Sequence, residues 1–202
     1  MLLYSIKQRK NMYSLDLLVS GNVASLKEEV RKISLITQAE KMNDDQHRGY
    51  LTSDAGIEHY KLLAYISSAY VGQTIYDIGT SVGNSSLALS YSPTTTVISY
   101  DIVDIKRISS APANVEYRIG DFRLDPEVLK APFIFIDVDP HDGIQEQAFH
   151  EFFLANNYKG IVMWDDINVQ GLQHWWPLIE NVTKLDITQA GHWSGTGLTI
   201  YN

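Results

Sequence analysis

Short apolar runs alternate with segments of helical periodicity from residue 74 to the end of the chain. The run at 132–137 (PFIFID) is almost continuously apolar, as expected for a strand that is buried on both faces of a sheet. Strands that alternate with helices favour a mainly parallel sheet with helices on both faces. The last two runs are neighbours joined by a Gly-rich loop, which predicts an antiparallel C-terminal edge. We therefore expect an α/β fold with a seven-stranded sheet. The predicted strands span 74–78, 96–100, 115–119, 132–137, 160–164, 182–188 and 198–201.

Apolar residues three and four positions apart mark the predicted helices. Residues 25–28 (SLKE) have the spacing of a capping box, and they open a run with Leu26 and Val30 on one helical face. Residues 42–50 are polar and are expected to form a loop, whereas residues 1–22 fit either a strand or a short helix. Further helices are predicted at 53–70, 84–91, 142–157 and 172–181.

Length and composition exclude several classes of protein. A chain of 202 residues buries roughly 70% of its unfolded surface, which is enough for one well-packed core. We expect a single domain over 1–202, in which 1–50 form a helical extension and 51–202 the ligand-binding core. Because there is no cysteine, disulfide bonds, thiolate-bound metals and a thiol nucleophile are excluded. With 16 Lys+Arg against 24 Asp+Glu, the net charge of −8 argues against a nucleic-acid partner.

The start of the chain and its longest charge-free stretch do not have the patterns of a secretory signal or a membrane-spanning helix. The first apolar run is short, and positive charges follow it, which is the reverse of a secretory signal. The stretch 78–100 has no charged residue, but its Gly, Ser, Thr and Pro content is wrong for a spanning helix of about 20 apolar residues. We expect a cytoplasmic protein with no membrane partner.

A glycine-containing turn follows the first predicted strand of the sheet. Gly79 and Gly83 let the backbone turn tightly and approach a ligand closely. Ser81 takes the place of the second glycine of a G-x-G-x-x-G motif, so a turn needed only for packing is the competing interpretation. Asp77, at a buried strand end, requires a cationic or hydrogen-bonding partner. Asp101 follows Asp77 by 24 residues, where an acid would hold the hydroxyls of a ribose. Together, the turn and the acid predict a nucleoside-containing ligand.

Four carboxylates follow two predicted strands that would be neighbours. Asp137 and Asp139 follow one strand, and the pair Asp165–Asp166 follows the next. Such a group repels itself unless a cation or protons intervene, and oxygen ligands without thiolate suit Mg²⁺, Ca²⁺ or Mn²⁺. The competing interpretation is that each Asp caps the helix after its strand, but this would not account for all four. His141 lies close to this group in sequence. Its expected role is that of a base or a metal ligand, and the competing interpretation is a structural or solvated residue.

Aromatic residues are concentrated in the last third of the chain. At least two of its four tryptophans are expected to pack in the core, but Trp164 lies directly before a carboxylate pair and would alternatively form a wall of a substrate pocket. The segment 191–197 (GHWSGTG) is too rich in glycine for a regular element, and we expect a hairpin loop or a flap over the site.

These motifs together resemble the class I S-adenosylmethionine-dependent methyltransferases, which have a Rossmann-like sheet. More narrowly, Thr52–Ser53 before a helix, followed by DIGTSVGNS at 77–85, is similar to the cation-dependent O-methyltransferases of the catechol and caffeoyl-CoA type. The Asp-x-Asp pattern at 137–139 is closer to the sugar O-methyltransferases of antibiotic pathways. The resemblance covers roughly residues 50–200, so 51–202 would be a Rossmann-like cofactor-binding core.

The resemblance implies a role for each matched residue. The catechol and caffeoyl-CoA type has a general-base lysine where this chain has Pro140, so proton removal would fall to Asp139 or to His141 as the catalytic residue. The implied ligands of Mg²⁺, or of another divalent cation, are Asp137, Asp165 and Asp166. The implied S-adenosylmethionine-binding residues are Thr52, Asp77, Gly79, Thr80, Gly83, Ser85, Asp101, Asp121, Phe122 and Asp137.

The expected activity is cation-dependent transfer of a methyl group from S-adenosylmethionine to a hydroxyl of a small molecule. A sugar, a catechol-like compound or another natural product would be the acceptor. Two other interpretations stay open: a metal-independent small-molecule methyltransferase, and a nucleoside-binding member of the fold that transfers no methyl group. The predicted N-terminal helices would cover either the site or a partner chain, as in a homodimer.

Overall fold

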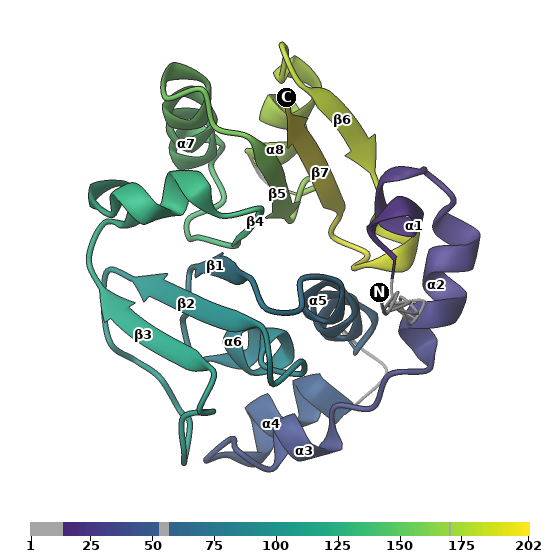
Figure 1. The fold of residues 1–202 in the computed structure, drawn as a ribbon, viewed down its shortest axis with the longest axis vertical. Coiled ribbons are helices and arrows are strands. Elements are labelled where there is room, and N and C mark those ends of the chain that lie inside the picture. The colour runs from purple at the N-terminus through teal and green to yellow at the C-terminus, as the bar shows by residue number, and fades with distance from the viewer. Residues whose placement is uncertain (1–13, 53–56, 170) are drawn as a thin grey trace, which may run out of the picture.

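One sheet forms the centre of the computed structural model, which describes residues 14–52, 57–169 and 171–202. Its strands are β1 (Thr74–Ile78), β2 (Thr96–Asp101), β3 (Val115–Ile119), β4 (Phe133–Ile136), β5 (Gly160–Asp165), β6 (Thr183–Asp186) and β7 (Thr196–Tyr201). Their order in the seven-stranded sheet is β3-β2-β1-β4-β5-β7-β6 (Figure 1). Neighbouring strands from β3 to β5 are parallel, and β7 runs antiparallel to both β5 and β6. The predicted α/β class, with its antiparallel C-terminal edge, is confirmed.

The strand order places a binding crevice at the centre of the sheet. From β1 the chain adds β2 and β3 on one side, and it then crosses back to place β4 and β5 on the other side. At such a switch point the connections leave the sheet in opposite directions, so a crevice opens beyond the carboxyl ends of the strands. The ends of β1, β2, β4 and β5 are therefore where a ligand is expected.

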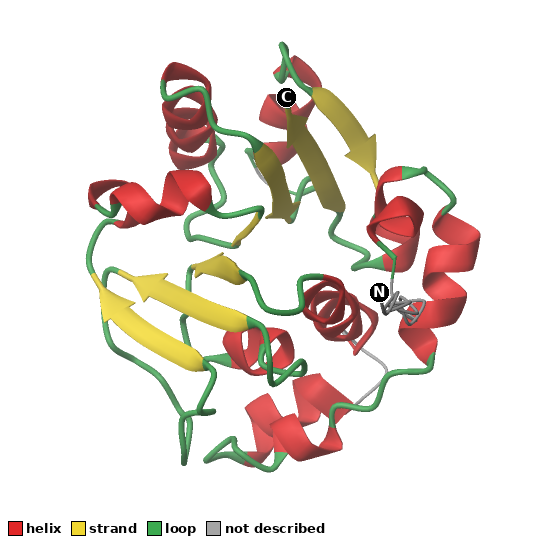
Figure 2. Cartoon of the chain, viewed as in Figure 1, coloured by secondary structure: helices red, strands yellow, loops and turns green. Residues whose placement is uncertain are grey.

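Helices cover both faces of the sheet (Figure 2). The helices are α1 (Leu15–Val19), α2 (Val23–Arg31), α3 (Ile36–Ala39), α4 (Asp45–Thr52), α5 (Ile57–Ala69), α6 (Asn84–Leu89), α7 (Ile144–Ala155) and α8 (Leu172–Trp175). Short 3-10 helices lie at η1 (Phe122–Leu124), η2 (Pro126–Lys130), η3 (Trp176–Leu178) and η4 (Thr188–Ala190).

The two faces of the sheet belong to two separate apolar cores. Phe133 and Phe135 of β4 pack with residues of α1, α2, α5 and α6, whereas Ile134 and Ile136 pack with residues of α7 and α8. Successive side chains of a strand point to opposite faces, so both sets must be apolar when both faces are covered. This explains the continuous apolar run that predicted the strand.

The N-terminal elements differ from the prediction. Helix α2 begins at Val23 with Asn22 as its N-cap, because the Asn22 side chain accepts a hydrogen bond from the Ser25 backbone N–H at 3.2 Å. Ser25 is thus inside the helix, and the capping box predicted at 25–28 is wrong. Within the polar stretch 42–50, predicted as a loop, helix α4 begins after Asp44, whose carboxylate accepts from the His47 N–H at 2.9 Å.

Other predicted helices differ in extent. Within the described residues, helix α5 spans Ile57–Ala69, and residues 53–56 of its predicted span lie outside the described residues. The segment predicted at 172–181 is helical only as far as Leu178, and its second half is the 3-10 helix η3. Pro177 explains the change, since proline has no N–H for an α-helical hydrogen bond and its ring crowds the preceding turn. Among the described helices, none is long and apolar enough to cross a membrane.

Candidate active site

A cavity of about 720 Å³ opens at the predicted edge of the sheet. Its wall combines the turn after β1, the end of β2, the turn before η1, the loop after β4, the end of β5 and the start of α7. Gly79, Asp101 and Asp137 lie at the ends of three adjacent strands and all line the cavity. The topology thus brings together residues from segments that are far apart in the chain.

Gly79 is required by the close approach of two strand ends. Its φ is +100°, and a Cβ atom at this position would lie 1.7 Å from the backbone carbonyl oxygen of Asp137. The backbone N–H groups of Gly79 and Thr80 both donate to the carbonyl oxygen of Tyr100, at 2.9 and 3.1 Å. The turn is therefore fixed between β2 and β4, where only glycine fits.

Asp77 lies beneath this turn rather than in the cavity. It is fully buried, and its Oδ2 accepts a 2.6 Å hydrogen bond from the Ser99 hydroxyl, which also contacts the Thr80 hydroxyl at 2.6 Å. Burial raises the pKa of Asp77 to about 7, against the opposing effect of hydrogen bonds from Ser99 and Ser85. Its Oδ1 has no hydrogen-bond partner. Asp77 thus supports the turn from below through a serine and threonine network.

Asp101 joins the turn to the following loop. Its Oδ2 accepts from the backbone N–H of Ser81 at 2.7 Å, and its Oδ1 accepts from the N–H of Val103 at 3.1 Å. Ser81 has a φ of +45°, a conformation that is uncommon for a residue with a side chain. The carboxylate lines the cavity and is held in a fixed direction by these two bonds.

An apolar wall continues from Asp101 around the cavity. Ile102 and Ile105 line it with more than half of their surface exposed, and the buried ring of Phe122 also lines the cavity. Asp121, directly before Phe122, is paired with Arg123 at 2.7 Å. Exposed isoleucines beside an acid suit a ligand that has both an apolar ring and hydroxyl groups.

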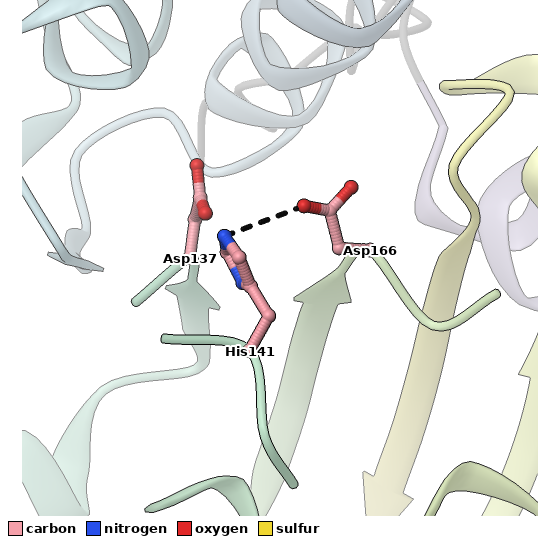
Figure 3. Close-up of side chains that lie close together, drawn as sticks. All are labelled: Asp137, His141 and Asp166. Carbon is pink, nitrogen blue, oxygen red and sulfur yellow. Dashed lines mark ion pairs between the residues drawn. The ribbon is translucent and has the colours of Figure 1, made fainter. Parts of the chain in front are cut away.

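Asp137, His141 and Asp166 form a compact cluster on the opposite wall of the cavity. Asp137 follows β4, His141 comes from the loop before α7, and Asp166 follows β5 (Figure 3). His141 Nε2 lies 3.5 Å from Asp166 Oδ2, and a potential ligand atom of each residue lies within 4.8 Å of those of the others. His141 and Asp166 have φ values of +54° and +58°. Such strained backbone is found at functional sites.

A second group shares Asp166. Asp165 and His192 lie with it in a cluster of the same size, and His192 Nδ1 is 4.0 Å from Asp166 Oδ1. Behind Asp165, the buried ring of His59 places Nδ1 at 3.6 Å from Asp165 Oδ1, and neither of these two atoms has a hydrogen-bond partner. The rings of His59 and His192 have their centroids 5.6 Å apart.

Burial and repulsion between like charges shift the pKa values of several groups in this region. Burial, followed by repulsion from Asp165, raises the pKa of Asp137 well above its usual value. Burial, followed by repulsion from Asp166, raises the pKa of Asp165 in the same way. Burial lowers the pKa of His59 to about 4, so this imidazole is neutral at pH 7. The groups around Asp137 and Asp165 therefore do not offset the cost of ionising both carboxyl groups in this buried region.

The predicted catalytic residues lie at the mouth of the cavity. The Asp139 side chain is 95% exposed, and its Oδ1 lies 3.3 Å from His141 Nε2. The Asp139 backbone carbonyl accepts a 2.8 Å hydrogen bond from the Gln145 side chain. Asp139 and His141 are thus in contact, and both line the cavity.

The structure divides the predicted site residues into two groups. Those that line the cavity are Gly79, Asp101, Asp121, Phe122, Asp137, Asp139, His141, Asp165 and Asp166. Those outside its lining are Thr52, Asp77, Thr80, Gly83 and Ser85. Thr52 is exposed at the end of α4, where its hydroxyl donates to the Arg48 carbonyl at 3.2 Å. Gly83 (φ +106°) is the N-cap of α6, so it forms the turn without facing the cavity.

Three residues in or near the site were missed by reasoning from the sequence. His59 and Tyr60 come from α5, and burial with the nearby charge of Asp137 raises the pKa of Tyr60. His192 lies in the β6–β7 connection, within the segment expected to form a hairpin loop or a flap, and it lines the cavity. The glycine content of that segment was a usable signal, whereas nothing in the local pattern of α5 marks His59.

Trp164 does not form a wall of the pocket. It is fully buried, its indole N–H donates to the Thr199 hydroxyl at 2.8 Å, and its ring packs against Trp175 with centroids 5.0 Å apart. The alternation of β5 explains this placement, since Trp164 points to the core beneath α8.

Comparison with known proteins identifies the fold. No protein-family model and no curated protein sequence matches the chain. A solved structure of an O-methyltransferase from Bacillus cereus in complex with SAH (S-adenosylhomocysteine) is 18% identical, with a TM-score of 0.50 over 94% of this chain and 98% of that one. The SAH-bound methyltransferase PaMTH1 from Podospora anserina is 11% identical, with a TM-score of 0.54 over 89% of this chain and 87% of that one. A methyltransferase from Geobacter sulfurreducens is 13% identical, with a TM-score of 0.50 and 90% of each chain covered. The chain therefore has the Rossmann-like fold of these methyltransferases.

Proposed function

We propose that this chain transfers the methyl group of S-adenosylmethionine to a hydroxyl oxygen of a small-molecule acceptor, with the help of a divalent cation. The observation that supports this most strongly is one continuous cavity that has Asp101 on one wall and the cluster of Asp137, His141 and Asp166 on the other. A nucleoside cofactor on the first wall would present its methyl group to an acceptor held at the second. The fold shared with SAH-bound methyltransferases is consistent with this arrangement.

The residues after β1 and β2 would hold the cofactor. A carboxylate has about four lone-pair sites, and the backbone N–H groups of Ser81 and Val103 use two of those on Asp101. The others would accept hydrogen bonds from the two ribose hydroxyls. Ile102 and Phe122 would cover the apolar faces of the adenine, with Asp121 at its edge.

The donor set beside the cofactor subsite fits a divalent cation. Asp165 Oδ1 is buried and has no hydrogen-bond partner, and burial, followed by repulsion among the carboxylates, raises the pKa of both Asp137 and Asp165. We propose that Asp137, Asp165 and Asp166 hold Mg²⁺ or another divalent cation. When bound, such an ion lowers the pKa of a hydroxyl group and fixes the direction of its oxygen.

The proton of the acceptor hydroxyl would pass to Asp139 or to His141, which are in contact at 3.3 Å. A lone pair of the acceptor oxygen then forms the new C–O bond while the C–S bond of the sulfonium breaks. The electrons of the broken bond stay on sulfur, so the products are a methyl ether and S-adenosylhomocysteine. Holding two reactants in line supplies much of the acceleration in a reaction of this kind.

The test combines cofactor binding with methyl transfer. We expect S-adenosylmethionine and S-adenosylhomocysteine to bind in calorimetry, and label to move from S-adenosylmethionine to one or more compounds in a panel of catechols, sugars and other hydroxylated natural products. Asp165→Ala should lose the cation-dependent turnover but keep S-adenosylhomocysteine binding. The matched control is Asp45→Ala, because the Asp45 side chain is 95% exposed on α4.

Each rival interpretation gives a distinct result in these experiments. Absence of binding to either nucleoside refutes the proposed function. Turnover that is unchanged in EDTA, or retained in full by Asp165→Ala, refutes the cation and favours a metal-independent methyltransferase. Cofactor binding without turnover across the whole panel favours a nucleoside-binding protein that transfers no methyl group.

A further inference from the structure

Strand β3 is the last strand on its side of the sheet, so one of its edges has no neighbouring strand (Figure 1). Its register with β2 is continuous from Val115 to Ile119, without a bulge. Apart from this ladder, the backbone groups of Tyr117 and Ile119 make no hydrogen bond within the part of the chain that the structure describes. A row of unpaired N–H and C=O groups at a sheet edge is a template for pairing with another strand.

The ladder with β2 shows which residues of β3 direct their backbone groups to the free edge. At one end the Asn114 carbonyl accepts a hydrogen bond from β2 at 2.9 Å, and at the other end the Gly120 N–H donates one to β2 at 2.8 Å. Successive residues of a strand direct their backbone groups to alternate edges, so the odd-numbered residues Val115, Tyr117 and Ile119 face away from β2. All three present a carbonyl oxygen to the free edge. Only Tyr117 and Ile119 also present an N–H, because the Val115 N–H donates within its own turn at 3.0 Å.

A second copy of this chain fits this edge, because the pattern of β3 is complementary to itself. When two copies of β3 pair antiparallel about Tyr117, the N–H and C=O groups of the two Tyr117 residues exchange hydrogen bonds. The Ile119 N–H then meets the Val115 carbonyl of the other copy. Between these bonded pairs, Glu116 of each copy lies opposite Arg118 of the other. Opposite charges at facing positions stabilise a pair of strands, whereas like charges destabilise it.

The side chains at this edge are available for such contacts. The Glu116 side chain is 57% exposed, and Ile119 is 55% exposed although it is apolar. Val115 of the other copy would cover Ile119. Within the chain, Arg118 lies 2.6 Å from Glu116 and 2.7 Å from Asp125, so its guanidinium is held beside the edge, where it would contact Glu116 of both copies.

We propose that two copies of this chain pair through antiparallel β3 strands centred on Tyr117, so that their sheets join into one continuous sheet across a two-fold axis. The N-terminal helices, expected from the sequence to cover either the site or a partner, would then lie outside the dimer contact. Because β3 has only five residues, the contact is short, and we expect monomer and dimer to be in equilibrium.

The oligomeric state is measured by sedimentation velocity of the whole chain over a range of concentrations, without metal or cofactor. We expect the unmodified chain to form dimers. Glu116→Arg should weaken dimerisation at least about 10-fold, because it places like charges at both symmetric contacts with Arg118. The matched control is Glu151→Arg, which changes the net charge equally at an exposed position of α7 and should leave dimerisation unchanged. Circular dichroism checks that each variant is folded.

A chemical cross-link tests the register of the two strands independently of their charges. Since the chain has no cysteine, Tyr117→Cys introduces one thiol, which lies opposite itself in the proposed dimer. A short bismaleimide should therefore join two chains of Tyr117→Cys, but not two chains of Glu151→Cys.

Several results would overturn the proposal. A chain that stays monomeric at every concentration would do so, as would the absence of a cross-link in Tyr117→Cys. A dimer that Glu116→Arg leaves intact would place the contact on another surface, such as the N-terminal helices. Loss of the dimer in Glu151→Arg as well would attribute the effect to net charge alone. None of these measurements involves S-adenosylmethionine or a cation, so their outcome is independent of the proposed function.

Discussion

Asp77 makes the stability of this chain depend on pH in a way that one substitution removes. Its carboxyl is fully buried, and burial raises its pKa from the ordinary 3.8 to about 7. A group whose pKa is higher in the folded chain holds its proton more tightly there than in the unfolded chain. Stability therefore falls as the pH rises from about 4 to about 7, the range between the unfolded and folded pKa values.

The size of the effect follows from the shift of about 3 pKa units. At 1.36 kcal/mol for each unit, ionising Asp77 at high pH costs about 4 kcal/mol of unfolding free energy. About 3 kcal/mol of this change falls between about pH 5 and 8, where urea unfolding is practical. Asp77→Asn has no proton to lose, so it lacks this part of the pH dependence.

The measurement is urea unfolding of both proteins over that pH range, in EDTA and without cofactor. The buried Asp137 and Asp165 titrate in both proteins, so their contributions largely cancel in the difference. We expect the difference in unfolding free energy to shift in favour of Asp77→Asn as the pH rises. Ser99→Ala removes a hydrogen bond that lowers the pKa of Asp77, and it should therefore extend the loss of stability to higher pH. A difference that stays constant with pH would refute the reasoning, since Asp77 would then have an ordinary pKa in the folded chain.

Three other substitutions test the turn, the cofactor subsite and the core. Gly79→Ala should lower the unfolding free energy, measured with urea, by at least about 1–2 kcal/mol because of its positive φ alone. It should also abolish S-adenosylhomocysteine binding, because the new Cβ would overlap the Asp137 carbonyl. Unchanged binding would contradict the described turn. Asp101→Ala should weaken S-adenosylhomocysteine binding in calorimetry by about 10- to 100-fold, since hydrogen bonds to a charged group contribute about 1.5–3 kcal/mol, and an unaltered affinity would place the ribose elsewhere. Trp164→Phe should lower the unfolding free energy by about 1–3 kcal/mol, because it removes the hydrogen bond from the indole N–H to the Thr199 hydroxyl and leaves space beside the smaller ring. Cofactor binding should stay unchanged, and weaker binding would indicate that Trp164 contacts the cofactor.

Helix boundaries were harder to predict than strands, and the two N-terminal errors show why. Ser25 and Asn22 are both good capping residues, and the choice between them depends on where the chain enters the helix. The sequence of α4 is mostly polar, and Leu51 is its one residue described as buried. Its Asp44 cap is a local signal that could have been used, but the apolar periodicity that normally identifies a helix is weak in this segment.

By itself, the sequence determined the strands, the glycine turn and the acids that follow the strands. These features depend on local chemistry: apolar runs for strands buried on two faces, glycine at a position with positive φ, and polar residues where a strand leaves the core. Only the tertiary structure decided that β1 lies between β2 and β4, which brings Asp101 and Asp137 to one cavity. It also decided that His59 and His192, from a helix and a loop, meet beside Asp165. Contacts of this kind depend on the order in which strands pair across the sheet, and no local pattern in the chain encodes that order.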